Sequence, residues 1–535
     1  MTPNSIAVPG VGTRRLTVEP RLRTGSRAGR AIAARALVPF AVAGFSGLLF
    51  ATAFPPLSWP TAAWVALAPL LAACAVLSPP RAAVAGMCWI AGVAVGVASF
   101  FPGMLSSYFG LASTPSWVGA LAIVGALHAT CVSAYAAWVA WLVRRRAANP
   151  LLLAGGWLVC EFARAHGALG CPWALTAYSQ LRWEALIQSA DLGGPYAIGM
   201  LVAAVNAAAA AWVVPALRGR RLLLTTAAIA AALVGTLLYG QWRLGQTFDD
   251  GPPVRVAVVQ GGAPPAARAQ RPARLADYVD LTRSGTAAQT GLIVWPEYAV
   301  EAYLEEPSAT RDAVLRVAEE ARADLILGGP HYEPSPAGTR YHNSAYLVHD
   351  GRLAGRYDKH RLVPGAEDDR FASLLGSVPS GYVAGRGARV LPASGLRVGT
   401  LLCFEAMFPE LARRAVQAGA EVLVNLSNDA WFGHPAPARQ QLDIATLRAV
   451  ENRRYVVRAA ATGFSAVIDP HGRTLARSEF NTLQVLNATV HAAHVRTPYQ
   501  RCGDAFAWVV IIGVAAATVW PLFHWSVRQQ PWEAS

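Results

Sequence analysis

The chain has 535 residues, of which 54% are hydrophobic and 15% are charged. Soluble domains average about 25% charged residues, so this composition excludes an entirely soluble protein and is typical of a membrane protein. The formal net charge of +14 would suit nucleic-acid binding, but the arginines are scattered between apolar segments. They do not gather on one soluble face, and we therefore expect no nucleic-acid partner.

Apolar segments of membrane-spanning length follow a basic amino-terminal stretch. The hydrocarbon core of a bilayer, about 30 Å thick, requires about 20 apolar residues per helical span. We predict eight spans, near residues 36–54, 61–78, 82–101, 117–143, 150–165, 194–217, 222–241 and 505–526. The first segment could instead be a signal peptide, but another apolar segment follows closely, and we interpret the first as a retained span.

The arginines predict the orientation of these spans, because Lys and Arg accumulate in cytoplasmic loops. Arginines are frequent in the amino-terminal stretch and in the loops at 144–146 and 218–221, whereas the loops at 55–60 and 102–116 contain no Lys or Arg. The large polar segment near the carboxyl end is thereby placed on the outer face, and the tail returns to the cytoplasm.

These boundaries divide the chain into four parts. They are a basic cytoplasmic segment, a membrane domain of about seven helices, a soluble domain, and a final helix with its tail, at residues 1–35, 36–241, 242–503 and 504–535. Five of the seven cysteines fall in or beside membrane segments, where they are interpreted as small core residues. No CxxC pair indicates a metal site, and we expect neither a metal nor a cofactor.

The soluble domain alternates short β-branched runs with helical stretches. Continuous apolar runs such as "VRVAVVQ" and "AEVLVNLSND" are typical of a sheet that is buried on both faces and covered by helices. The pattern predicts an α/β domain, with helices near residues 270–289, 308–322, 409–418 and 438–452.

Three chemically active side chains lie where predicted strands end. Glu297 ends "LIVWPE", Cys403 follows "VGTLL", and Lys359 follows a strand and turn pair. Ligands of such sheets bind beyond the strand ends, so we expect the three side chains to converge. Glu297 would act as a general base, and Cys403 would act as a nucleophile. The ammonium of Lys359 would favour the thiolate and stabilise negative charge on a carbonyl oxygen.

Lys359 is the only lysine among 46 Lys and Arg residues. An ammonium is a compact point charge, whereas a guanidinium is a wide planar fork, so the exception indicates a task that arginine cannot perform. Each residue alone also has a simpler interpretation. Lys359 could be a surface residue, Glu297 a neighbour of a helix start, and Cys403 a small buried hydrophobe.

Segments of the soluble domain resemble the nitrilase superfamily of carbon–nitrogen hydrolases. They are "VVQGG", "LIVWPE", "YDKHRLVPGAE", "LLCFE", "NLSNDAWFG" and "RAAATGFSAVIDPHG". The membrane segments "FPPLSWPTAAWVALAPLL" and "LGCPWALTAYSQ" are similar to the membrane domain of the apolipoprotein N-acyltransferase family, so the resemblance covers nearly the whole chain. It implies a multi-span α-helical membrane domain joined to an extracytoplasmic α/β nitrilase-like domain, an α-β-β-α sandwich. It also implies a bacterial inner membrane, with the catalytic domain in the periplasm.

By position, the resemblance implies that Glu297 is the base, Lys359 the cation on the oxyanion side and Cys403 the nucleophile. Glu367 matches a second glutamate that supports the lysine, and Glu405 matches another acid near the active site. The implied reaction moves an acyl chain from a phospholipid to Cys403 as a thioester. A diacylglyceryl-cysteine lipoprotein then accepts it on its terminal amine. The implied partners are these two lipids and the bilayer, and we expect a monomer.

Four departures from the family pattern concern the surroundings of the three groups. Gly365 and Ala366 replace the usual Phe-Gly pair before the second glutamate, and Phe404 replaces a common tyrosine. No tryptophan follows Gln260, and His434 stands in a variable place. The departures affect the expected choice of acyl donor and of acceptor.

Several other residues are weaker candidates. Glu161 and Arg164 lie in a predicted span and mark either a functional site or a mutual ion pair. We interpret His434 as a solvated loop residue, and Trp173 and Tyr178 as part of an interfacial aromatic belt. A polar group after one strand is expected to shape a turn instead of performing chemistry: Asn425, Ser427, Asn428 and Asp429.

Two alternative functions remain open at the level of the sequence. A membrane-tethered amidase or nitrilase would use the same three groups but would need a water path to its thioester. A non-catalytic membrane scaffold would not depend on Cys403. Retention of the sole lysine within its motif favours an enzyme.

Overall fold

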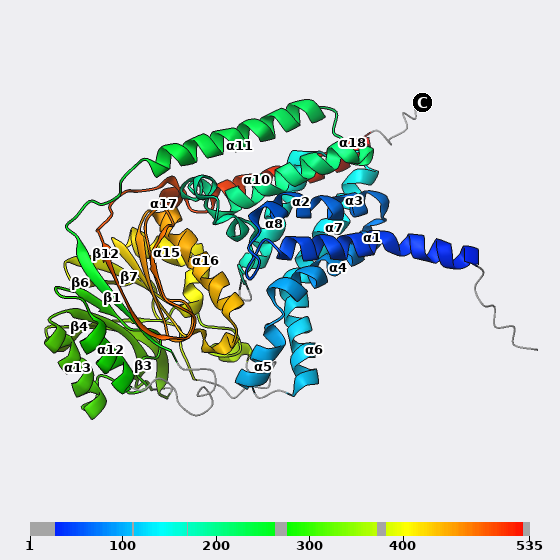
Figure 1. Ribbon diagram of the computed structural model, residues 1–535. Helices are drawn as coiled ribbons and strands as arrows, with labels where there is room; N and C mark the ends of the chain where they lie inside the picture. The colour runs from blue at the N-terminus through cyan, green and yellow to red at the C-terminus, as the bar shows by residue number, and fades with distance from the viewer. Residues whose placement is uncertain are drawn as a thin grey trace, which may run out of the picture.

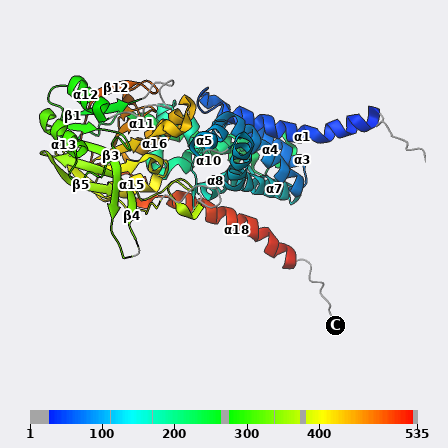
Figure 2. The same ribbon diagram turned by 90° about the horizontal axis from the view of Figure 1, so that it is seen from below.

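The computed structural model describes residues 27–109, 112–167, 170–262, 275–336, 338–371 and 381–527. Most of the helices of the amino-terminal half gather on one side of the molecule with the last helix, and two β-sheets lie on the other (Figure 1). The outer ends of α1 and α18 both extend away from the sheets (Figure 2). The chain is thus divided into a helical part and a sheet part, as the composition predicts.

The helical part contains an apolar helix at each predicted span. Its main helices are α1 (Arg27–Ala51), α2 (Ala63–Ala66), α3 (Ala68–Val76), α4 (Pro79–Val97), α5 (Phe101–Phe109), α6 (Ser113–Val124), α7 (Thr130–Arg144), α8 (Pro150–Ala165), α10 (Ala190–Val213), α11 (Leu222–Leu244) and α18 (Ala505–Val527). By length and composition α4, α10 and α11 can each cross a membrane, and shorter apolar stretches lie at Arg35–Ala51, Pro60–Val76 and Ala505–Val519.

Side chains on the outer faces of α11 and α18 are apolar and exposed. Leu223 of α11 and Val509 of α18 are 71% and 70% exposed. Contiguous exposed apolar surface is unfavourable in water and favourable against lipid tails. These two helices therefore present the surface expected at a bilayer.

The structure adds local detail to two of the predicted segments. The predicted outer loop at 102–116 contains most of helix α5 and the start of α6. Along the predicted span at 117–143, α6 continues into α7 through a π-helical turn, Gly125–Ala129. The side of the membrane on which each segment lies stays a prediction.

The sheet part consists of two six-stranded mixed sheets. In strand order, the first sheet contains β12 (Leu483–Val490), β1 (Val254–Gly261), β2 (Leu292–Val294), β3 (Asp324–Glu333), β4 (Arg340–His349) and β5 (Arg352–Asp358). The second contains β11 (Thr474–Arg477), β10 (Ala466–Ile468), β9 (Tyr455–Ala460), β8 (Val422–Ser427), β7 (Leu396–Leu402) and β6 (Val390–Ala393). In each sheet the three central strands run parallel, as β1, β2 and β3 and as β7, β8 and β9.

Side chains alternate between two apolar layers, which explains why the runs carry so few polar residues. On β1, Val256 and Val258 pack in the core that also contains side chains of β7 and β8, whereas Ala257 and Val259 pack with the helices outside. The covering helices are α12 (Leu275–Gly285) and α13 (Ala309–Ala321) on the first sheet, and α15 (Pro409–Gln417) and α16 (Pro435–Asn452) on the second. This arrangement is the α-β-β-α sandwich that the sequence motifs predicted.

Helices α15 and α16 join the two parts of the molecule. Their buried apolar side chains belong to the same continuous core as those of the membrane helices. Gln440 of α16 donates through Nε2 to the carbonyl of Pro55 at 3.4 Å and to that of Val97 at 3.3 Å. Helix α16 thus lies between the second sheet and the helical part (Figure 1).

Candidate active site

Lys359 lies at the centre of a buried ion cluster. Its Nζ lies 3.1 Å from Oε1 of Glu297 and 2.8 Å from Oε2 of Glu367. The three residues are 1%, 3% and 6% exposed. Burial opposes the charged ammonium, but the two carboxylates dominate and hold the pKa of Lys359 well above its ordinary value. The sole lysine of the chain is therefore a buried, permanently charged group.

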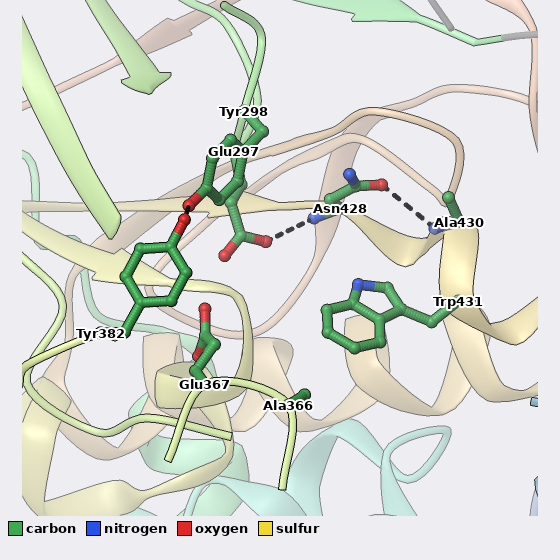
Figure 3. A pocket seen from close by; sticks show the side chains of 8 residues that line it. All are labelled: Glu297, Tyr298, Ala366, Glu367, Tyr382, Asn428, Ala430 and Trp431. Atoms are coloured by element: carbon green, nitrogen blue, oxygen red, sulfur yellow. Dashed lines mark hydrogen bonds between the residues drawn. The ribbon is translucent and has the colours of Figure 1, made fainter. Parts of the chain in front are cut away.

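Two asparagines position the carboxylates of this cluster. The Nδ2 of Asn343 donates to Oε1 of Glu297 and to Oε1 of Glu367, both at 2.8 Å. The backbone N–H of Asn428 donates to Oε2 of Glu297 at 2.9 Å, as Figure 3 shows. Sequence reasoning did not identify Asn343. The available signal was a polar residue that opens the otherwise apolar run "NSAYLVH" on β4.

Cys403 lies at the end of β7 in a left-handed backbone conformation, with φ of 48°. Such a conformation costs a residue other than glycine about 1–3 kcal/mol and is concentrated at functional sites. Tyr298, which follows Glu297, shares this feature with φ of 52°. The two strand ends thus carry local strain where the predicted base and nucleophile stand.

Burial raises the pKa of the Cys403 thiol to about 12, and the negative charge of Glu297 adds to this effect. The ammonium of Lys359 and a hydrogen bond with Ser427 lower the pKa, but they do not offset the increase. The ammonium of Lys359 favours the thiolate, as expected, but burial outweighs its effect on the pKa. The site holds a neutral thiol beside a carboxylate that can accept its proton.

Glu405 has a different position from the other two glutamates. It is fully buried and accepts the backbone N–H groups of Leu402, His360 and Arg361 at 2.7, 2.7 and 3.0 Å. The hydroxyl of Tyr357 donates to both of its oxygens at 2.9 Å. Burial raises the pKa of Glu405, and these donors oppose the increase. Glu405 thus ties the segment that carries Lys359 to the strand that carries Cys403.

Of the polar group expected to shape a turn, Asn425 and Ser427 lie within β8, and Asn428 and Asp429 follow it. Asp429 accepts from the fully buried Arg458 at 2.8 Å and from the Ser427 hydroxyl at 2.7 Å. Asn425 contacts the same arginine through its side-chain oxygen. Arg458 was not identified from the sequence, because a lone arginine in a strand gives no distinctive signal.

Glu161 and Arg164 form an ion pair with each other at 3.2 Å, and both also hydrogen-bond to the loop after α8. Glu161 accepts from the N–H of Thr176 at 2.7 Å, and Arg164 donates to the carbonyl of Trp173 at 2.6 Å. The aromatic-belt interpretation is wrong for Tyr178, which is 4% exposed and accepts from Arg448 of α16 at 3.3 Å.

Trp173 also faces the protein instead of forming a belt. Its indole N–H donates to Gln440, and its ring contacts Phe100 and Phe432, with centroids 5.8 Å apart in each case. His434 is exposed and its Nδ1 accepts from the N–H of Ala436 at 3.2 Å, which agrees with a loop residue.

One cavity borders the ion cluster, and a second borders Cys403. The smaller, of about 330 Å³, is lined by the residues drawn in Figure 3, among them Glu297, Glu367 and Tyr382. The larger, of about 500 Å³, is lined by Cys403 and Phe404 and continues between the membrane helices. Its wall is almost entirely apolar. Ala366 lines both cavities, so the small residues that depart from the family pattern border the open space.

Within the described ranges, no group of three His, Cys, Asp or Glu side chains is arranged to hold a metal ion. The acidic side chains that lie close together here are paired with Lys359 instead.

Comparisons with known proteins agree with this architecture. The carbon–nitrogen hydrolase family model matches residues 255–498, and the model of the apolipoprotein N-acyltransferase N-terminal domain matches residues 46–208. An apolipoprotein N-acyltransferase of Geobacter metallireducens is 32% identical, over 92% of this chain and 96% of its own. One from Methylococcus capsulatus is 31% identical, over 88% and 93%. Among solved structures, an amidase from Nesterenkonia sp. is 19% identical with a TM-score of 0.34, covering 46% of this chain and 93% of its own.

The protein is therefore of the class that joins a carbon–nitrogen hydrolase domain to a membrane domain of apolar helices. Within that class, the chain belongs to the apolipoprotein N-acyltransferase family, and the assignment made from the sequence motifs is confirmed.

Proposed function

We propose that the protein transfers an acyl chain from a membrane phospholipid, through a thioester on Cys403, to the terminal amine of a diacylglyceryl-cysteine lipoprotein. The names of its relatives support acyl transfer to lipoproteins. One structural observation carries the choice of a lipid donor. The cavity that reaches Cys403 is apolar and extends between membrane helices, where an acyl chain can enter and water is disfavoured.

In the first half-reaction, Glu297 takes the proton of the Cys403 thiol as the sulfur attacks the sn-1 ester carbonyl. The raised pKa of the thiol makes such a base necessary at neutral pH. Lys359 stabilises the oxygen that becomes negative in the tetrahedral intermediate. The C–O bond breaks, Glu297 returns the proton to the leaving oxygen, and a lysophospholipid departs.

In the second half-reaction, the lipoprotein amine attacks the thioester carbonyl and Glu297 accepts the proton of the nitrogen. The C–S bond breaks, the proton passes to the sulfur, and the product is an amide. Glu367 and Glu405 support the reaction without touching the substrate, the first through Lys359 and the second through the backbone around it. The apolar wall disfavours competing attack by water.

We place the enzyme in the bacterial inner membrane as a monomeric multi-pass protein, with residues 36–241 spanning the bilayer. Residues 242–503 then form the periplasmic catalytic domain, and residues 504–535 return to the cytoplasm. The arginine-rich loops at one end of the spans support this orientation.

The experiment uses the purified full chain, a radiolabelled phospholipid and a synthetic diacylglyceryl lipopeptide. We expect label to reach the lipopeptide amine in the wild type and not in Cys403→Ala. Without acceptor, we expect hydroxylamine-sensitive label on the wild-type protein. Labelled lipopeptide in the Cys403→Ala reaction would refute the mechanism, and release of free fatty acid as the main product would favour a hydrolase.

A further inference from the structure

Three aromatic rings of the membrane domain line the apolar cavity that reaches Cys403. Phe50, Trp89 and Trp157 line it and are only 2–3% exposed. The ring centroids of Trp89 lie 5.1 Å from Phe50 and 5.3 Å from Trp157. They come from α1, α4 and α8, so each of three helices contributes one ring to this aromatic cluster.

Helix α4 forms a continuous wall of this cavity. The lining residues Trp89, Ile90, Val93, Ala94 and Val97 recur at the spacing of one helix face. At 1.5 Å rise per residue, Val97 and Trp89 lie about 12 Å apart along the axis. The earlier buried α4 residues, Ala82, Ala85 and Gly86, do not line the cavity. The wall therefore ends at Trp89.

We propose that Phe50, Trp89 and Trp157 set the longest acyl chain that the enzyme transfers. This inference rests on the proposed function, because the occupant is the acyl chain bound to Cys403. Cys403 lines this cavity in the sheet part, and the three rings, which contact one another, line it among the membrane helices. A chain that reaches the rings gains burial for every methylene, whereas a longer chain must bend or displace an aromatic side chain.

The binding free energy of each buried methylene sets the expected change in chain-length preference. Each buried methylene favours binding by about fourfold, so two methylenes gained or lost change the preference by on the order of tenfold. Ala94 lies on the same wall about 7 Å above Trp89, so a larger side chain there shortens the space. Val95, the next residue, is 66% exposed on the outer side of α4.

The test gives the full-length enzyme an equimolar mixture of phospholipids with one headgroup and dodecanoyl, tetradecanoyl, hexadecanoyl or octadecanoyl chains. The chains on Cys403 are then measured by mass spectrometry. We expect Ala94→Phe to lower the ratio of octadecanoyl to dodecanoyl adduct by on the order of tenfold, and Trp89→Leu to raise it similarly. The matched control Val95→Phe leaves the ratio unchanged.

Each outcome distinguishes the inference from the proposed function. A wild-type protein without any acyl group on Cys403 overturns both. Normal acylation with the same ratio in all variants overturns only the inference, as does an equal loss of every chain length in Ala94→Phe. If Trp89→Leu does not fold, the comparison of Ala94→Phe with Val95→Phe decides alone.

Discussion

Two of the buried ion clusters among the described residues differ in the arrangement of their charges. At the active site, Lys359 lies between Glu297 and Glu367, within 3.1 Å of each. At the boundary between membrane and catalytic domains, Asp191 of α10 accepts from Arg243 of α11 at 2.6 Å and from Arg453 after α16 at 2.8 Å. One cluster has two carboxylates around a compact cation, and the other has two wide cations around a carboxylate.

The difference between the two clusters shows where this chain uses arginine and where it uses lysine. Arg453 also donates to the carbonyls of Gln188 and Pro470 at 3.0 and 3.1 Å, so its planar fork is fixed by several acceptors. Lys359 instead holds its compact charge between Glu297 and Glu367, and both of these carboxylates line a cavity. Arg453 connects several acceptors at the boundary between the two parts of the molecule, whereas in the proposed mechanism Lys359 stabilises the charge that develops during the reaction.

The largest effect is expected when Lys359 is replaced with arginine. The positive charge remains, but the wide guanidinium cannot occupy the compact site between the carboxylates, so the developing oxyanion loses its donor. We expect the rate of acyl transfer to fall by about 10²–10³-fold. The measurement is single-turnover acylation, with thermal unfolding to show that the variant folds. Activity close to that of the wild type would contradict the assignment.

The reciprocal change, Arg453→Lys, should damage stability and spare chemistry. Lysine keeps the charge but cannot reach Asp191, Gln188 and Pro470 together. We expect the free energy of unfolding to fall by about 2–3 kcal/mol, below the cost of removing a buried partner entirely. Thermal unfolding in detergent checks the stability, and activity is normalised to folded protein. A loss of activity without a loss of stability would break the comparison.

Glu405→Gln should give a smaller and mixed effect. The amide can accept fewer of the N–H groups that now hold the lysine segment, and its own NH₂ is left facing donors. We expect a loss of about 1–3 kcal/mol in stability and a loss of activity on the order of tenfold. The control is Glu320→Gln, which alters an exposed ion pair with Arg283. Equal behaviour of the two variants would remove the role given to Glu405.

The smallest effect concerns the pH dependence of Cys403 alkylation in the resting enzyme. A free cysteine reaches its full reactivity above a pH of about 8.5. Because the pKa of Cys403 is raised to about 12, its alkylation rate should keep rising with pH beyond that point. In Glu297→Gln the repelling charge is absent, so the profile should shift to lower pH. Peptide mass spectrometry measures the rate, and a plateau near pH 8.5 in the wild type would contradict the raised pKa.

The strand ends of the sheet part were predictable from the sequence, because they follow from local pattern. Glu297 and Cys403 each follow a run of apolar residues. Their strands, β2 and β7, belong to different sheets, and local pattern did not predict that division. The proximity of Glu367 to Lys359 came instead from the family motif. No spacing rule requires a residue eight positions later to return to the same ammonium.

Features that depend on packing between domains were not predictable. Tyr178 and Trp173 are residue types that are common in an interfacial aromatic belt. Their hydrogen bonds with Arg448 and Gln440 depend on the packing of α16 against the membrane helices. Asn343 gives no signal of its role, because it depends on two carboxylates from distant segments. The pKa of Cys403 likewise depends on how deeply the fold buries the sulfur. The sequence shows that Lys359 is a cation, but it does not show how deeply the sulfur of Cys403 is buried.

The most direct test of the central claim is peptide mass spectrometry of the full-length protein after incubation with phospholipid alone. We predict a single fatty acyl thioester on the peptide that contains Cys403, absent after hydroxylamine and strongly reduced in Lys359→Arg. An acyl group on another residue, or an unmodified Cys403 in protein that still transfers acyl chains, would contradict the account.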